Sequence, residues 1–178
     1  MTRFAGWGLA AVLAAVALTR GISAQADMVM GTATSGATKV VMTSGMAVSY
    51  TAPNGRLISV LLSDKPADKK EFATDTKTGP GEPLMSGIFE GAWKSQHIGG
   101  KLSGFVFTLN ADKKVIGEEF LVGGRNNTFS IGDEYVVEVK STSPRLVGSI
   151  KTKTPVVDLG TTKAGLEATF DLAVEALK

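Results

Sequence analysis

The stretch GFVFTLN, residues 104–110, decides the fold class of this chain. Its large apolar residues, Phe105, Phe107 and Leu109, fall on alternate positions, with other residues between them. Successive side chains of a β-strand point to opposite faces of a sheet. The spacing therefore predicts a strand with one face on an apolar core and the other face towards solvent.

Other segments of the chain repeat this alternation. EYVVEVK, residues 134–140, and GLEATFDLAVE, residues 165–175, both alternate with a period of two. RLISVLLS, residues 56–63, is apolar nearly throughout, which is typical of a central strand covered on both faces. We predict an all-β, mainly antiparallel fold, either a sandwich or a barrel-like closed sheet of about eight or nine strands.

Turn residues punctuate these strands. Pro53-Asn54-Gly55 separates two of them and has the composition of a hairpin turn. The sequence Ser63-Asp64-Lys65-Pro66 offers a helix cap followed by a proline that suits a first helical turn. We therefore expect one short helix near residues 65–73.

The N-terminal segment has the features of a cleavable signal peptide. It combines an early positive charge, an apolar run from Phe4 to Leu18, and an A-x-A cleavage site at residues 24–26. The apolar run is shorter than the ~20 residues that a membrane-spanning helix needs. We expect residues 1–26 to be removed. A single β-rich domain, residues 27–178, would then be periplasmic or secreted and would have no transmembrane segment. An uncleaved N-terminal anchor is the alternative.

The net charge and the cysteine content exclude some classes of function. The predicted leader holds Arg3, Arg20 and no acidic residue, so its removal lowers the net charge from +2 to zero. A neutral chain offers no electrostatic argument for binding to nucleic acid or to an anionic membrane, so we expect no nucleic-acid partner. The chain has no cysteine, which excludes disulfides, thiolate metal sites and a cysteine nucleophile.

The stretch WKSQHIGG, residues 93–100, holds the only histidine. We interpret it as a surface loop and predict Trp93, Gln96 and His97 as candidate ligand-binding residues. Catalysis by His97 would need an exposed hydroxyl and an orienting acid. Ser95, two residues away, is the candidate for the hydroxyl, and Glu90 is a candidate for the acid. No G-x-S-x-G nucleophile motif occurs in the chain, so no catalytic residue is assigned and the protein is not expected to be an enzyme.

Metal ligands and cofactor motifs are sparse. The chain has one histidine and no thiol, so it offers few of the ligands that transition metals prefer. The acidic pairs Glu118-Glu119 and Asp133-Glu134 are adjacent in sequence, and neighbours on a strand point to opposite faces. We therefore predict no metal site and no cofactor.

Three segments resemble small exported bacterial β-rich proteins of unassigned function. They are GRLISVLLSDKPAD at residues 55–68, EYVVEVKSTSPRLVGSIKTK at residues 134–153, and GLEATFDLAV at residues 165–174. The resemblance implies export and β architecture. The resemblance assigns no functional residue, because none of these segments contains a catalytic or ligand-binding motif.

Together these features favour an exported, non-catalytic binding or structural module of the bacterial envelope. Its partner would be an unidentified protein or a small apolar ligand. A first alternative is a lipocalin-like carrier, in which the large apolar residues of the strands line a cavity for a small apolar ligand. A second alternative is a hydrolase centred on His97.

Overall fold

The computed structural model describes residues 25–77, 87–124, 128–160 and 162–177. Most of the predicted leader, residues 1–24, lies outside this part of the chain. Two helices are described, α1 (Lys69–Asp75) and α2 (Ile88–Ile98), and neither has the length and apolar character needed to cross a membrane. The strands are β1 (Met28–Ser35), β2 (Thr38–Met42), β3 (Ser44–Ala52), β4 (Gly55–Ser63), β5 (Gly104–Leu109), β6 (Val115–Leu121), β7 (Thr128–Phe129), β8 (Tyr135–Thr142), β9 (Arg145–Thr152), β10 (Val157–Asp158) and β11 (Lys163–Ala176).

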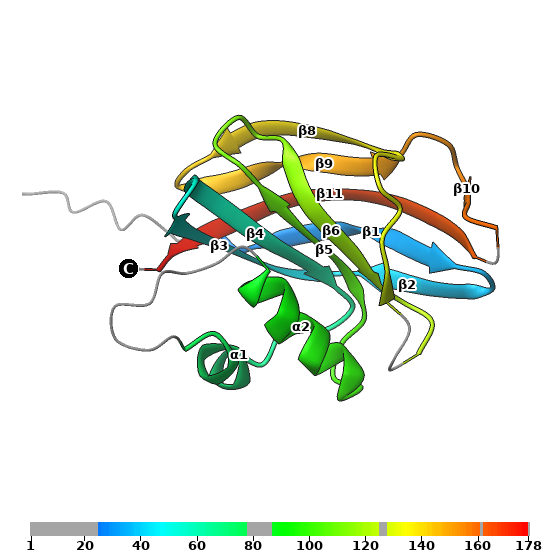
Figure 1. Ribbon diagram of the computed structural model, residues 1–178, viewed down its shortest axis with the longest axis horizontal. Helices are drawn as coiled ribbons and strands as arrows, with labels where there is room; N and C mark the ends of the chain where they lie inside the picture. The colour runs from blue at the N-terminus through cyan, green and yellow to red at the C-terminus, as the bar shows by residue number, and fades with distance from the viewer. Residues whose placement is uncertain (1–24, 78–86, 125–127, 161, 178) are drawn as a thin grey trace, which may run out of the picture.

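The described strands form one mixed sheet of eleven, and the long strand β11 joins its two halves (Figure 1). In one half β11 pairs with β1 on one side and with β9 on the other, both antiparallel. Its last residues, Val174 to Ala176, leave that half and pair in parallel with β3, which begins the β3-β4-β5-β6-β7 half. The prediction of a mainly β, largely antiparallel fold is confirmed.

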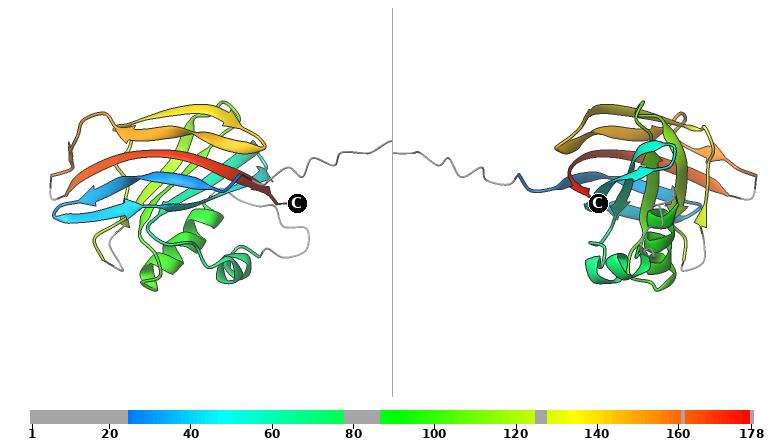
Figure 2. Two further views of the ribbon diagram at one scale, coloured as in Figure 1. Left: turned by 180° about the vertical axis from the view of Figure 1, so that it is seen from behind. Right: turned by 60° about the vertical axis from the view of Figure 1, so that its left-hand side comes forward.

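The two halves of the sheet pack against each other through a phenylalanine-rich core. Strands β4 to β6 cross over β1, β9 and β11 in the views of Figures 1 and 2. Phe107 of β5 lies 5.8 Å from Phe170 of β11, measured between ring centroids. Because β11 belongs to both halves, they remain one sheet that does not close. The prediction of a sandwich or a closed barrel is therefore not confirmed.

Strand β4 is central and buried on both faces, as the apolar run at residues 56–63 predicted. Val60 and Leu62 point into the core between the halves, while Leu57 and Leu61 belong to a second cluster on the opposite face. Strand β5 is also buried on both faces, so the expectation that one face of residues 104–110 meets solvent is wrong. The reason is helix α2, which covers that face next to β4 and β5 (Figure 1).

Helix α1 corresponds to the single short helix predicted near residues 65–73, but it begins later. Asp68 caps it, and its side chain accepts hydrogen bonds from the backbone N–H groups of Lys70 and Glu71, both at 3.0 Å. Ser63, which was expected to lie near the cap, is the last residue of β4, and its hydroxyl donates to the Lys65 carbonyl at 2.7 Å. The second helix, α2, was not predicted.

Candidate functional site

Helix α2 forms because one of its faces is buried against the sheet at helical spacing. Gly87, with φ of 91°, precedes its first turn, and Gly100, with φ of 72°, follows its last. Its buried side chains are Phe89, Ala92, Trp93, Gln96 and His97, and the three apolar ones pack in one cluster with residues of the sheet. The prediction of a surface loop at residues 93–100 is therefore wrong for residues 93–98. The predicted loop begins at Trp93, four residues after Phe89, where the helical spacing of apolar residues starts. Gly91 within the helix costs about 1 kcal/mol, and packing on the sheet outweighs that cost.

The structure brings Trp93, Gln96 and His97 together on α2 and buries them, with exposures of 0 %, 0 % and 2 %. Gln96 binds the backbone of Asp68 at the start of α1: its Oε1 accepts from the Asp68 N–H at 2.9 Å and its Nε2 donates to the Asp68 carbonyl at 3.0 Å. The ring of Trp93 stacks on Phe72 of α1 at 5.2 Å. These contacts hold the two helices together, and the ligand-binding role of the three residues stays a prediction.

His97 has one hydrogen bond among the described residues. Its Nδ1 lies 2.9 Å from the carbonyl oxygen of Leu102. Since a carbonyl oxygen can only accept, Nδ1 carries the proton and donates. This bond ties the end of α2 to the segment that leads into β5, and neither a carboxylate nor a hydroxyl is a partner of the ring.

A chain of buried hydroxyls runs across the sheet and ends at Glu90 of α2. The phenol of Tyr50 lies 3.2 Å from the hydroxyl of Ser59, which in turn lies 2.7 Å from that of Thr108. The Thr108 hydroxyl donates to Oε1 of Glu90. Each hydroxyl has one proton, so the chain is satisfied when each group donates towards the carboxylate. Three adjacent strands, β3, β4 and β5, supply these hydroxyls.

Burial changes the acid–base properties of this chain. Removal from water raises the pKa of the Glu90 carboxyl above its ordinary value, and the charge of Glu119 adds to the rise, while hydrogen bonds to the carboxylate oppose it. Burial also raises the pKa of Tyr50, against the opposing effect of its hydrogen bond with Ser59. The second oxygen of Glu90, Oε2, is buried and has no hydrogen-bond partner among the described residues.

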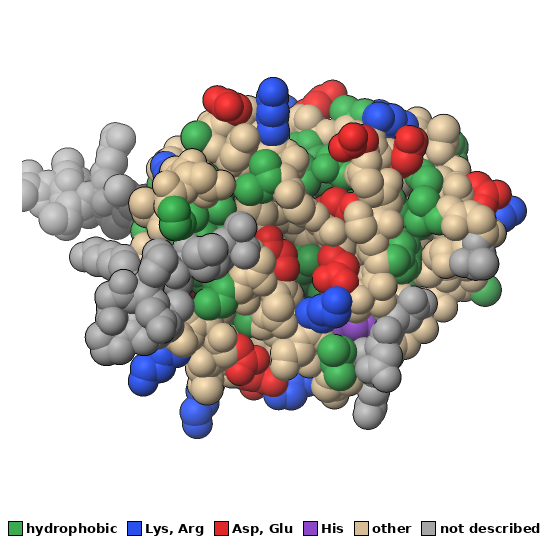
Figure 3. Space-filling view, viewed as in Figure 1, with side chains coloured by type: hydrophobic (Ala, Val, Ile, Leu, Met, Phe, Trp, Pro, Cys, Tyr) green, Lys and Arg blue, Asp and Glu red, His purple; other side chains and the backbone are tan. Residues whose placement is uncertain are grey.

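Glu90 lines a surface cavity of about 280 Å³ between the start of α2 and strand β6. Acidic side chains gather around this hollow near the centre of the face shown in Figure 3. Ile116, 47 % exposed, is the one large apolar side chain of the wall. The residues that line the cavity are Gly87, Glu90, Thr108, Ile116, Gly117, Glu118 and Glu119.

The other two acids of the cavity have different partners. Glu119 forms an ion pair with Lys94 of α2 at 2.7 Å. Glu118 points to the opposite face of β6, as alternation predicted, and its Oε1 accepts from the backbone N–H groups of Ile131 at 2.9 Å and Gly132 at 3.0 Å. Burial raises the pKa of Glu118, and the charge of Glu119 contributes to the rise. On the side of β6 that faces α2, Lys94 balances the charge of Glu119, so an ionised Glu90 carries the charge that is left over.

Sequence reasoning missed this cavity although it considered each of its acids. Glu90 was weighed as a partner of His97, but the two residues bond to different groups. Glu118 and Glu119 were considered together as metal ligands and set aside. The signal in the sequence is the spacing of Glu90 and Lys94, which lie four residues apart and therefore on the same side of a helix.

Within the part of the chain that the structure describes, no group of three or more histidine, cysteine, aspartate or glutamate side chains is arranged to hold a metal ion. The cavity therefore offers single carboxylates rather than a chelating set. Comparison of the chain with models of protein families, with curated proteins and with solved structures found no match.

Proposed function

We propose that the protein is an exported, non-catalytic binding module of the bacterial envelope, and that it binds a small organic amine in the cavity beside Glu90. The observation that carries the proposal is the carboxyl of Glu90 in the lining of the cavity: Lys94 pairs with Glu119, so the charge of Glu90 has no partner of opposite sign among the lining residues. Its Oε2 also has no hydrogen-bond partner among the described residues. An ammonium group has three donors and one positive charge, and it complements both features.

The size and lining of the cavity support a small ligand with a short carbon chain. A volume of about 280 Å³ corresponds to roughly nine water molecules at about 30 Å³ each. This is near the lower limit of ligand pockets and is too small for a lipid. Ile116 offers an apolar contact for the carbon atoms of an alkylamine.

The burial of the hydroxyls supports a non-catalytic role. Ser59 and Thr108 are 0 % and 1 % exposed and are already engaged in the hydroxyl chain. A nucleophile needs a free hydroxyl that reaches its substrate, whereas the Thr108 hydroxyl is bonded to Glu90 and Ser59 is not among the residues that line the cavity. The buried ring of His97, bonded to a backbone carbonyl, likewise gives no support to a hydrolase centred on that residue.

Support for an apolar-ligand carrier is weaker, because the phenylalanines that would line its cavity pack on one another. Phe105 and Phe120 lie 4.9 Å apart, as do Phe120 and Phe129. None of these rings lines the cavity beside Glu90. Rings packed this closely fill a core rather than surround a ligand.

Titration of the purified protein with butylammonium chloride and with butanol, followed by amide NMR shifts at pH 7.5, tests the proposal. We expect butylammonium to shift the signals of Gly87 and Gly117 and butanol to leave them in place. Glu90→Gln keeps the acceptor for Thr108 and removes the charge. It should weaken butylammonium binding about tenfold or more, since a hydrogen bond to a charged group contributes about 1.5–3 kcal/mol.

Glu138→Gln is the matched control, because Glu138 is an exposed residue of β8 outside this cavity. It should leave butylammonium binding unchanged. Equal binding of butylammonium and butanol would contradict the amine proposal and favour a carrier of apolar ligands. An equal loss of affinity in both variants would show that the cavity is not the binding site.

A further inference from the structure

Arg145, the first residue of β9, holds the chain on both sides of the bond between Ala26 and Asp27. Its Nη1 donates to the carbonyl of Gln25 at 2.9 Å, and its Nη2 donates to the carbonyl of Ala26 and to Oδ1 of Asp27, both at 3.2 Å. The same guanidinium donates from Nε to Oδ1 of Asp171 at 2.5 Å. The predicted leader cleavage site is therefore adjacent to a group of charges on the folded domain.

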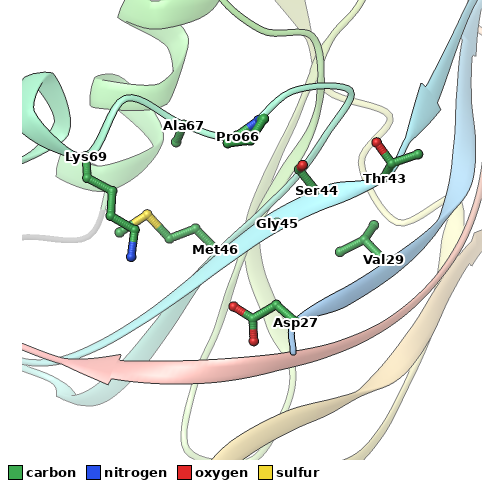
Figure 4. A pocket seen from close by; sticks show the side chains of 9 residues that line it. All are labelled: Asp27, Val29, Thr43, Ser44, Gly45, Met46, Pro66, Ala67 and Lys69. Atoms are coloured by element: carbon green, nitrogen blue, oxygen red, sulfur yellow. The ribbon is translucent and has the colours of Figure 1, made fainter. Parts of the chain in front are cut away.

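Asp27 is built into the fold. Its Oδ1 accepts from the backbone N–H of Ala173 at 2.7 Å, which fixes the residue beside β11. It also lines a cavity of about 200 Å³ whose far side is formed by Pro66, Ala67 and Lys69 (Figure 4). The chain before β1 thus becomes fixed at Asp27, directly after the bond that a signal peptidase would cut.

The charges around Asp27 do not balance in the uncut chain. The carboxylates of Asp27 and Asp171 face the single guanidinium of Arg145, which leaves one excess negative charge. Lys69 of α1 also lies near Asp27, but it is paired with Glu175 of β11 at 2.6 Å, so this pair is neutral as a whole. One more positive charge would complete the group.

We propose that the chain is cut between Ala26 and Asp27, and that the new α-ammonium group of Asp27 completes an ion cluster with Arg145, Asp171 and its own carboxylate. In this hydrolysis, water adds across the peptide bond. Ala26 leaves with the new carboxylate, and Asp27 keeps the nitrogen as a protonated amine. The inference rests on the export part of the proposed function and is independent of the amine cavity.

The cluster has a consequence for the acid–base behaviour of the mature protein. The ordinary pKa of an α-amino group is about 7.7–8.0. Arg145 opposes a second positive charge, but it is paired with Asp171, and the two carboxylates together favour the protonated amine. The pKa in the folded state therefore rises above the unfolded value. The stabilisation is complete below the unfolded pKa and is lost as the pH rises through the folded pKa.

Two forms of the chain 27–178 test this, one with a free α-amine and one acetylated at that amine. This chain contains every residue of both core clusters, so it retains the parts of the fold that stabilise it. The acetyl carbonyl replaces that of Ala26, and the modification therefore removes the charge alone. We expect the unfolding equilibrium constant of the acetylated form to be about two- to fivefold higher at pH 6.5 and equal at pH 9.5.

Asp171→Asn should return the α-amino pKa, followed by NMR, to about 7.7–8.0. The mass of the protein exported from bacteria that express the full chain should correspond to a first residue of Asp27. A different first residue, an α-amino pKa at or below the ordinary value, or equal stability of the two forms at pH 6.5 would overturn the inference. Amine binding beside Glu90 is measured separately, so the two proposals can fail independently.

Discussion

Replacing Phe170 by alanine should destabilise the protein strongly, because this ring joins the two halves of the sheet. Phe170 is 2 % exposed and lies in the middle of β11, opposite Gly148 of β9. Its ring contacts Phe107 of the other half, and a β-carbon placed on Gly148 would lie 3.0 Å from two of its ring atoms. The ring therefore fills the space that the missing side chain of Gly148 leaves open.

The size of the loss follows from the buried area. A buried aromatic residue removes roughly 150–250 Å² from water. At about 25 cal/mol per Å², this corresponds to about 4–6 kcal/mol of transfer free energy. Alanine keeps a small part of this area, and core Phe→Ala substitutions cost about 3–5 kcal/mol. We expect a loss near 4 kcal/mol, a large part of the 5–15 kcal/mol that typically stabilises a domain.

Equilibrium unfolding in urea, followed by far-UV circular dichroism, measures this loss. Phe170→Leu keeps most of the side-chain volume and should cost less than about 1.5 kcal/mol. Val136→Ala, at a position 39 % exposed on β8, is a surface control that should change the free energy of unfolding by about 0.5 kcal/mol or less. A loss below about 1 kcal/mol for Phe170→Ala, with an unchanged denaturant slope, would refute the assigned role of the ring.

Gly148→Ala extends the test to the contact itself. The added methyl group would meet the Phe170 ring and would also collide with the carbonyl oxygen of Glu138. We expect a cost of about 1–3 kcal/mol in the wild-type chain. The cost should be smaller in the Phe170→Ala background, where only the backbone collision remains. Additive effects of the two substitutions would show that the ring does not pack over Gly148.

Gly104→Ala should cost about 3 kcal/mol or more, because its methyl group would collide with the carbonyl oxygen of Leu62. Gly117→Ala, which meets nothing within 4 Å, is the control in thermal unfolding. Gln96→Ala should cost about 1–3 kcal/mol, since it leaves the Asp68 backbone without its partners, and should speed hydrogen exchange in α1. Burial raises the pKa of Glu90, so its contribution to stability is complete below about 4.3 and falls as the pH rises through the folded pKa. Glu90→Gln should remove this pH dependence, and an unchanged profile would contradict the burial argument.

The strands that sequence reasoning located best are those with a strict period of two. The predicted strands around Phe105, Tyr135 and Leu166 are β5, β8 and β11 of the structure. Alternation is a local property of the backbone, so a short window of residues is enough to detect it. The count of about eight or nine strands was too low, because the two-residue strands β7 and β10 carry no periodic signal.

Helix α2 and the candidate site were beyond sequence reasoning for a different reason. A period of two shows that a strand has two faces, but it does not show what covers the second face. In β5, Val106 and Thr108 alternate with Phe105, Phe107 and Leu109. Val106 belongs to the cluster that includes α2, and Thr108 is part of the hydroxyl chain to Glu90. Tyr50, Ser59 and Thr108 are separated by 9 and 49 residues, and only the pairing of β3, β4 and β5 places them in a row.

The sequence by itself determined the mainly β class, the central position of β4 and the turn between β3 and β4, because each depends on neighbours along the chain. Tertiary structure alone decided that β11 serves both halves of the sheet, and that Arg145 meets Asp27 across 118 residues. It also placed the acids of α2 and β6 around one cavity. Such contacts depend on how buried faces pack in three dimensions, and no local pattern of residue types encodes that packing.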